Sequence, residues 1–192
     1  MTARTHDLAT VTALGIVFLT MSLPTMTLST AILTVFANLI GGITPDIDQP
    51  TAPLWRNLPI GRLFSRTFHL LTGGHRFLTH SLLGVALFGF ATHWLLIFLH
   101  PIMTTVDRRL VWYGFMIGLV SHLVMDSFTK EGVPWLLPIP VKFGFPPFKG
   151  LRITTGKKLE TFVVFPGLVI INVAFIYAHY HHILDILHRH IV

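Results

Sequence analysis

The sequence predicts an all-α fold, a polytopic membrane helix bundle with about five transmembrane helices. The composition indicates a membrane protein, because 52% of the 192 residues are hydrophobic, only 11% are charged and the mean hydropathy is +0.68. Apolar segments recur along the whole chain without a repeat or a second domain, so residues 1–192 are expected to form one integral membrane domain. The absence of cysteine excludes disulfides, thiolate metal sites and cysteine nucleophiles.

Five apolar segments are the expected helices: Leu8–Leu23, Leu28–Ile43, Phe77–Leu99, Leu110–Phe128 and Leu159–Tyr180. The first two are short for a bilayer that needs about 20 helical residues. Pro24 cannot continue the first helix, so these two segments are expected to form a tight hairpin. The first segment lacks a strongly basic start and a small-residue cleavage site, which favours a retained helix over a signal peptide.

Five crossings would place the N-terminus and the loops at 44–76 and 129–158 on one side of the membrane. The opposite side would hold the C-terminus and, of the 14 lysines and arginines, only Arg108, Arg109 and Arg189. The first side would hold the other basic residues: Arg4, Arg56, Arg62, Arg66, Arg76, Lys130, Lys142, Lys149, Arg152, Lys157 and Lys158. Because basic loops stay in the cytoplasm, we expect a multi-pass protein of a bacterial-type inner membrane with a cytoplasmic N-terminus and an external C-terminus.

Side chains of the kind that bind metals gather at the cytoplasmic end of these segments. They are His6, Asp46, Asp48, His75, His80, His122, Asp126 and Glu160. His122 and Asp126 are one helical turn apart, so they can converge on one ion. Asp46 and Asp48 lie in one short turn and can point into one cavity or bridge two cations. Ionisable groups near lipid are costly unless they are paired or metal-bound, and therefore indicate function.

Imidazole and carboxylate ligands favour a divalent metal such as zinc, with manganese as an alternative, in a site of one or more ions. Such an ion lowers the pKa of a bound water, generates a hydroxide nucleophile and polarises a phosphoryl or acyl oxygen. Arg76, together with Lys157 and Lys158, can hold a phosphate. Glu160 can act as a further ligand or as a general base, and Glu160, Asp48 and Arg76 are the catalytic candidates.

Each of these features also has a simpler interpretation. The pair in the fourth segment can be a buried hydrogen-bonded pair, and the two aspartates after the second segment can form a turn or cap a short helix. Arg76, Lys157 and Lys158 can anchor the chain at the cytoplasmic surface, and Glu160 can cap the last helix. None of these interpretations explains why all of the residues fall on one side.

Five motifs carry a resemblance to a known family. They are "THD" near the start, "LIGGITPDID", "GGHRFLTHS", "GLVSHLVMDSFTKEG" and "ITTGKKLE". In this order they resemble the LexA-regulated, membrane-bound metal-dependent hydrolases, the YdjM-like family, over nearly the whole chain. The resemblance implies metal-site roles for His6, Asp46, Asp48, His75, His80, His122 and Asp126, and hydrolysis as the activity. Phe77 departs from the small residue that the family places there, which changes the expected shape of the pocket.

The expected function is therefore hydrolysis of a phosphoester or ester bond of a membrane lipid at the cytoplasmic interface, by metal-bound hydroxide. The expected partners are a lipid substrate and the bilayer, and no nucleic acid. Two other classes remain open. A metal or proton-coupled transporter would use the same histidines and aspartates but would tend to place them near the bilayer midplane, and a non-catalytic structural membrane protein would need no ligands.

Overall fold

The regular structure of the chain is helical in the computed structural model, which describes residues 1–20, 26–49, 76–139 and 141–181 and the single positions 55, 61 and 184. The α-helices are α1 (Ala3–Thr20), α2 (Leu28–Ile43), α5 (Leu82–Leu99), α6 (Arg108–Ser127) and α7 (Phe165–Ala178). The 3-10 helices are η1 (Pro45–Asp48), η2 (His100–Ile102) and η3 (Lys149–Leu151), and a π-helical segment, η4 (Glu160–Val164), leads into α7. Within the described residues, β pairing is limited to two isolated bridges, Thr129–Ile153 and Val133–Phe143. The predicted all-α fold is confirmed.

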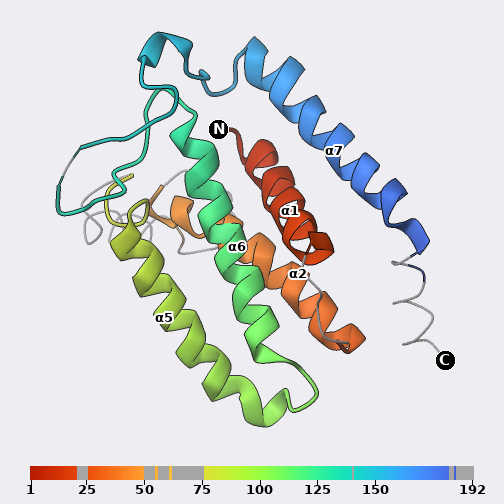
Figure 1. Cartoon of the computed structure of the whole chain (residues 1–192). Helices are drawn as coiled ribbons and strands as arrows, with labels where there is room; N and C mark the ends of the chain where they lie inside the picture. The colour runs from red at the N-terminus through yellow and green to blue at the C-terminus, as the bar shows by residue number, and fades with distance from the viewer. Residues whose placement is uncertain are drawn as a thin grey trace.

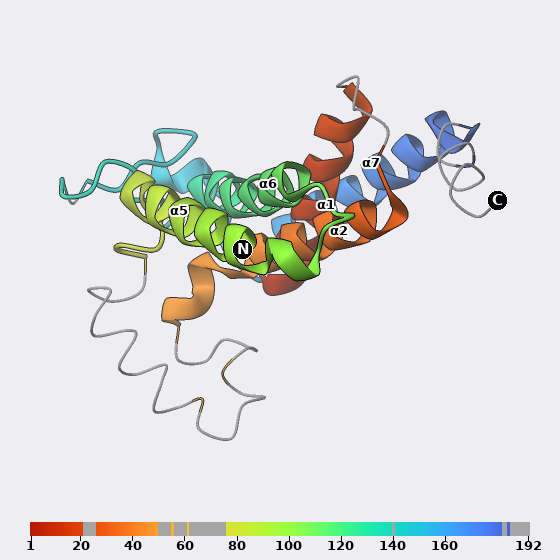
Figure 2. The same ribbon diagram turned by 90° about the horizontal axis from the view of Figure 1, so that it is seen from below.

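Helix α6 is the central element of the bundle. It contacts α2, α1 and α5, while α7 packs against α1 (Figure 1). The view from below places α5 and α7 at opposite edges (Figure 2). The N-terminus of α1 and the C-terminus of α6 consequently lie at the same end of the bundle, although more than a hundred residues separate them in sequence.

Helix α2 has the predicted bounds, and the other four α-helices begin elsewhere: α6 begins at Arg108 instead of Leu110, and α7 at Phe165 instead of Leu159. Helix α5 begins at Leu82 instead of Phe77, because the Ser81 hydroxyl oxygen accepts a hydrogen bond from the Gly84 amide (3.1 Å) and caps the helix. Residues 77–81 form a turn instead. Helix α1 begins at Ala3 instead of the predicted Leu8. The polar residues before the apolar segment are therefore helical as well.

Glycines bring the backbones of α2 and α6 into contact. A Cβ atom added at Gly118 would overlap the Asn38 carbonyl, and one added at Gly41 would overlap the Phe115 carbonyl. Gly114 lies against Thr34 in the same way. Small residues at such positions are typical of helix interfaces in membranes, where close packing replaces the hydrophobic effect as the source of stability.

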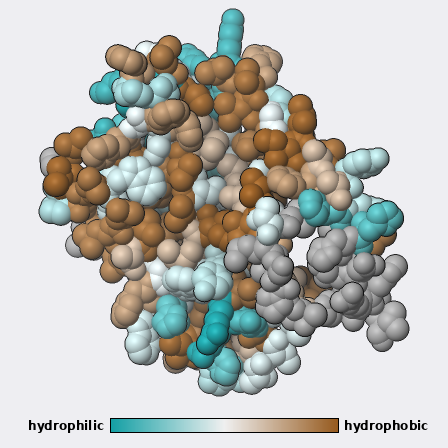
Figure 3. Space-filling view, viewed as in Figure 1, coloured by the Kyte–Doolittle hydropathy of each residue, from teal (hydrophilic) through white to brown (hydrophobic). Residues whose placement is uncertain are grey.

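The interior of the bundle contains polar side chains beside apolar ones such as Leu119 and Leu123, and its exterior is apolar. Thr10, Thr30, Thr34 and Asn38 are buried, and the Asn38 amide donates a hydrogen bond to the Gly114 carbonyl (3.1 Å). Large apolar side chains cover the outside instead, especially along α5 and α7. Figure 3 shows hydrophobic residues over much of the middle of one face and hydrophilic residues at its upper and lower ends. An apolar surface of this extent is favourable in contact with lipid and unfavourable in contact with water.

Three helical stretches of the described chain are long and apolar enough to cross a membrane: Leu82–Ile102, Arg108–Ser127 and Glu160–Ala178. Helix α2 is apolar but has only 16 residues, which corresponds to about 24 Å against a hydrocarbon thickness of about 30 Å. Helix α1, with 18 residues, is also short. Both short helices pack on α6, and together the five α-helices form the bundle that the sequence predicted.

The close approach of α2 and α6 predicts that Gly118→Ala destabilises the protein. The added methyl group would collide with the backbone of α2, and overpacking of this kind costs about 1–3 kcal/mol. Thermal unfolding of the detergent-solubilised protein measures the effect. Gly15→Ala in α1 is the matched control, because no atom lies within 4 Å of its added Cβ. Equal unfolding temperatures for the two variants would contradict the proposed tight contact.

Candidate metal centre

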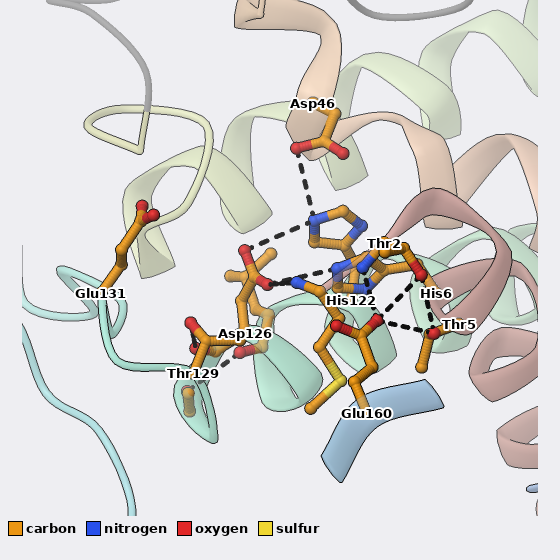
Figure 4. Close-up of polar contacts among 12 residues, drawn as sticks. Thr2, Thr5, His6, Asp46, His122, Asp126, Thr129, Glu131 and Glu160 are labelled. Carbon is orange, nitrogen blue, oxygen red and sulfur yellow. Dashed lines mark hydrogen bonds and ion pairs between the residues drawn. The ribbon is translucent and has the colours of Figure 1, made fainter. Parts of the chain in front are cut away.

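Five of the side chains predicted to bind metal lie together at one end of the bundle (Figure 4). His6 comes from the first turns of α1, Asp46 from η1, and His80 from the turn before α5, while His122 and Asp126 come from the last two turns of α6. All are buried except Asp46, whose side chain is 34% exposed. Their possible ligand atoms form two groups of three, each within 4.8 Å: His6, His122 and Asp126, and Asp46, His80 and His122. The predicted ligand His75 lies outside the described residues.

The His122 ring has a defined orientation and tautomer. Its Nδ1 atom lies 2.6 Å from the Gly42 carbonyl oxygen. A carbonyl only accepts hydrogen bonds, so Nδ1 donates and the Nε2 atom of the neutral ring keeps its lone pair. This buried Nε2 has no hydrogen-bond partner among the described residues and lies 3.6 Å from Asp46 Oδ1 and 3.8 Å from Asp126 Oδ2. Three electron-pair donors therefore face one another.

The His80 ring is oriented in a comparable way by a hydroxyl group. Thr79 Oγ1 donates its hydrogen to Asp48 Oδ2 (2.5 Å), so it accepts one from His80 Nδ1 (3.0 Å). The Nε2 atom of His80 then lies 3.5 Å from Asp126 Oδ2 and 3.9 Å from Asp46 Oδ1. Asp48 belongs to neither group of possible ligands. It acts on the His80 ring through the Thr79 hydroxyl, which it holds in place. Thr79 was not predicted, although its place directly before His80 was visible in the sequence.

Four donor atoms of the cluster, two imidazole nitrogens and two carboxylate oxygens, lie close together. His80 Nε2 and His122 Nε2 each lie between 3.5 and 3.9 Å from Asp46 Oδ1 and Asp126 Oδ2. Ligands at about 2.1 Å from zinc in a tetrahedral site lie about 3.4 Å apart. The donor set of two imidazoles and two carboxylates fits a zinc-like divalent ion in its chemistry, and the four nitrogen–oxygen distances are close to this spacing.

Asp126 is also surrounded by positive and hydrogen-bonding groups. Its Oδ1 atom lies 2.7 Å from the amino nitrogen of Met1 and 3.2 Å from His6 Nε2, and its Oδ2 atom lies 2.7 Å from Arg76 Nη2. The His6 ring stacks on the His122 ring, with centroids 3.8 Å apart. Because His122 Nδ1 is bonded to a carbonyl, His122 offers one nitrogen and can serve only one ion. A second ion near His6 would have to share the Asp126 carboxylate.

Arg76 connects the buried cluster to the surface. Its guanidinium group contacts Asp126 and the Thr129 hydroxyl (3.2 Å), and it also lies 3.3 Å from Glu131, whose side chain is 63% exposed. Arg76 has a φ of 58°, in the left-handed region that residues other than glycine rarely adopt. The Arg76 amide donates a hydrogen bond to Asp48 Oδ2 (3.1 Å), which holds this conformation.

Glu160 lies beside the cluster and contacts the start of α1 (Figure 4). Its Oε1 atom accepts hydrogen bonds from the Thr2 amide (2.6 Å), the Thr2 hydroxyl (2.8 Å) and the Thr5 hydroxyl (2.7 Å), and its Oε2 atom accepts one from the Gly156 amide (2.7 Å). The buried carboxylate therefore joins the last helix to the first one and fixes the turn that carries His6. Thr2 and Thr5 are part of this arrangement and were not predicted.

This geometry predicts that Glu160→Ala lowers stability in the absence of any metal. The substitution leaves the buried Thr5 hydroxyl without its acceptor, at a cost of about 1–3 kcal/mol, and removes three partly exposed hydrogen bonds from Thr2 and Gly156. Thermal unfolding in a chelator measures this cost, and Glu131→Ala, which removes an exposed carboxylate, is the control. A Glu160→Ala protein that unfolds at the wild-type temperature would exclude this bracing role.

Relatives of the chain are membrane proteins or uncharacterized. Inner membrane protein YdjM of Escherichia coli (strain K12) is 32% identical over 126 residues, which are 63% of this chain and 56% of that protein, so the match spans a little over half of its length. Uncharacterized protein YvsG of Bacillus subtilis (strain 168) is 29% identical over 143 residues, 74% of this chain and 77% of the relative. No solved structure matches the chain. The model of the YdjM inner membrane protein family matches residues 1–186, and the chain therefore belongs to this family.

Proposed function

We propose that this protein is a membrane-embedded, metal-dependent hydrolase that cleaves a phosphoester or ester bond of a lipid at the cytoplasmic membrane interface. The observation that carries the proposal is a set of four donor atoms in which the Nε2 atoms of His80 and His122 each lie 3.5–3.9 Å from one oxygen of Asp46 and one of Asp126. His122 Nε2 is buried and has no hydrogen-bond partner among the described residues, although it faces two carboxylate oxygens. The Met1 amino group and Arg76 offset the charge of Asp126, and a bound cation would in addition satisfy the imidazole nitrogen, whose burial is otherwise costly.

His80, His122, Asp46 and Asp126 would hold the first ion, with zinc preferred and manganese as the alternative. When bound, the ion would supply Lewis acidity and lower the pKa of a coordinated water. His6, on the far side of the Asp126 carboxylate, would complete the site or take part in binding a second ion.

The other residues of the cluster would orient the ligands and the substrate. Asp48, through Thr79, fixes the His80 ring and also fixes the Arg76 backbone, so we assign it a positioning role. The Arg76 guanidinium would bind the phosphate or ester oxygen, because it lies between buried Asp126 and exposed Glu131. Glu160, which braces α1, would position His6.

The place of the cluster in the fold supports a lipid substrate. The five side chains lie at the ends of α1, α2, α5 and α6, where a headgroup meets the membrane surface, and the partly exposed Asp46 marks the open side. Transporters tend to place such groups near the bilayer midplane, so this position favours hydrolysis at the interface. The charge distribution supports a cytoplasmic location of this end, with the N-terminus in the cytoplasm and the C-terminus outside.

The proposal predicts stoichiometric zinc or manganese in the purified protein. His122→Ala and Asp126→Ala are each expected to lose this metal, because each removes a central ligand. Plasma mass spectrometry of tag-free protein in detergent measures the content. His93→Ala is the control, because His93 is an exposed histidine of α5 that belongs to neither group of possible ligands. A protein that binds no metal even after reconstitution would refute the proposal.

A second prediction concerns Arg76 and catalysis. Arg76→Ala is expected to retain the metal but to lose about 100-fold or more in the hydrolysis of phospholipids and lipid phosphates, because a charged donor to the reacting group is removed. Turnover by metal-replete protein in inside-out membrane vesicles, compared with right-side-out vesicles, measures the activity and its sidedness. If the metal-replete protein hydrolyses no lipid and moves the metal across vesicles, it is a transporter.

A further inference from the structure

A groove on the surface of the bundle ends beside the candidate metal centre. It has a volume of about 540 Å³, within the range of ligand sites, and lies between α1 and α6, with Leu168 of α7 at its edge. Helix α1 supplies one wall between Ala9 and Val17, and α6 supplies the other between Tyr113 and Met125. The two helices also contact each other.

The length of the groove corresponds to one leaflet of a bilayer. From Tyr113 to Met125 the wall of α6 rises by about 18 Å at 1.5 Å per residue. One leaflet contributes about half of a hydrocarbon thickness of about 30 Å. The groove runs along a helix that is long and apolar enough to span the membrane, so its long axis follows the direction of the lipid tails.

One end of the groove lies at the level of the metal ligands. Met125 and Ser121, which line it, directly precede Asp126 and His122 on α6, and Ala9 follows His6 by about one turn of α1. A molecule lying in the groove would therefore have one end next to the cluster and the other end inside the bilayer.

The walls fit a hydrocarbon chain better than a water-soluble ligand or a second protein helix. They are built almost entirely from aliphatic, aromatic and methionine side chains. The Thr12 hydroxyl in the wall already donates to the Leu8 carbonyl (2.7 Å) and accepts from the Asn172 amide (2.6 Å). A packed helix would need small residues on both walls, whereas α6 presents Met116, Ile117 and Val120.

We infer that this groove binds one acyl chain of the lipid substrate and thereby places the headgroup bond at the metal centre. The inference rests on the proposed function for the identity of the substrate. It adds the route by which the substrate arrives, which is laterally from the bilayer between α1 and α6.

Photolabelling tests the groove without any turnover. The protein, treated with chelator, is reconstituted into vesicles that contain phosphatidylglycerol with a diazirine in one acyl chain, and adducts are mapped by mass spectrometry. We expect adducts concentrated on Met116, Ile117 and Val120. Ala13→Trp should abolish this labelling by filling the groove, and Ala86→Trp, on the exposed face of α5, should leave it unchanged. Val120→Trp, from the opposite wall, replaces Ala13→Trp if that variant does not fold.

The inference would be overturned by labelling spread evenly over the outward faces of α5, α6 and α7, or by labelling unaffected by both groove variants. Crosslinks between two copies of the chain through the groove would also overturn it. The proposed function fails separately, if groove labelling is found but the metal-replete protein hydrolyses no lipid. If both hold, the groove variants should lose lipid turnover and retain turnover of a water-soluble phosphoester.

Discussion

The contact between the backbones of α2 and α6 is the constraint on which the rest of the structure depends. Gly41 and Gly118 allow the two helices to touch, and the next residue of α2, Gly42, is thereby close enough to hold the His122 ring through its carbonyl oxygen. The same contact places η1, which directly follows α2, over the end of α6, so that Asp46 faces His122. A larger residue at these glycines would separate the helices and, with them, the imidazole from its carbonyl and its carboxylate neighbours.

The polarity of the bundle explains how lipid and a charged cluster coexist. Threonines and Asn38 bond to helix carbonyls inside the bundle, where no water is needed, and many large apolar side chains point outward to the lipid. The charges are confined to one end and compensate one another: Asp126 is surrounded by nitrogen donors, and Arg76 bridges it to a surface carboxylate. Removing one member of such a buried set leaves the others uncompensated, which is more costly than losing a surface ion pair.

The sequence predicted the helical membrane class, the bounds of α2 and the family, because these follow from apolar length and from combined motifs. The sequence did not show which of two neighbouring aspartates is a ligand and which one supports the ligands. Among the predicted ligands, Asp46 belongs to the donor cluster, whereas Asp48, two residues later, supports it through Thr79. In a 3-10 helix of three residues per turn, side chains two positions apart point about 120° away from each other, and a sequence does not show which of the two faces the cluster. Phe77 was expected inside a helix because it is apolar, but the Ser81 cap starts α5 later and leaves His80 in a turn.

The π-helical segment Glu160–Val164 determines how the last helix attaches to the first one. Glu160 contacts Thr5 of α1, and Asn172 contacts Thr12 of α1, two points that lie on the same face of α1. In an uninterrupted α-helix, residues 160 and 172 would point about 120° apart at about 100° per residue. A π turn accommodates one extra residue and reduces this difference to about 20°. The π turn therefore brings residues 160 and 172 to the same face of the last helix. This allows both residues to form hydrogen bonds with α1.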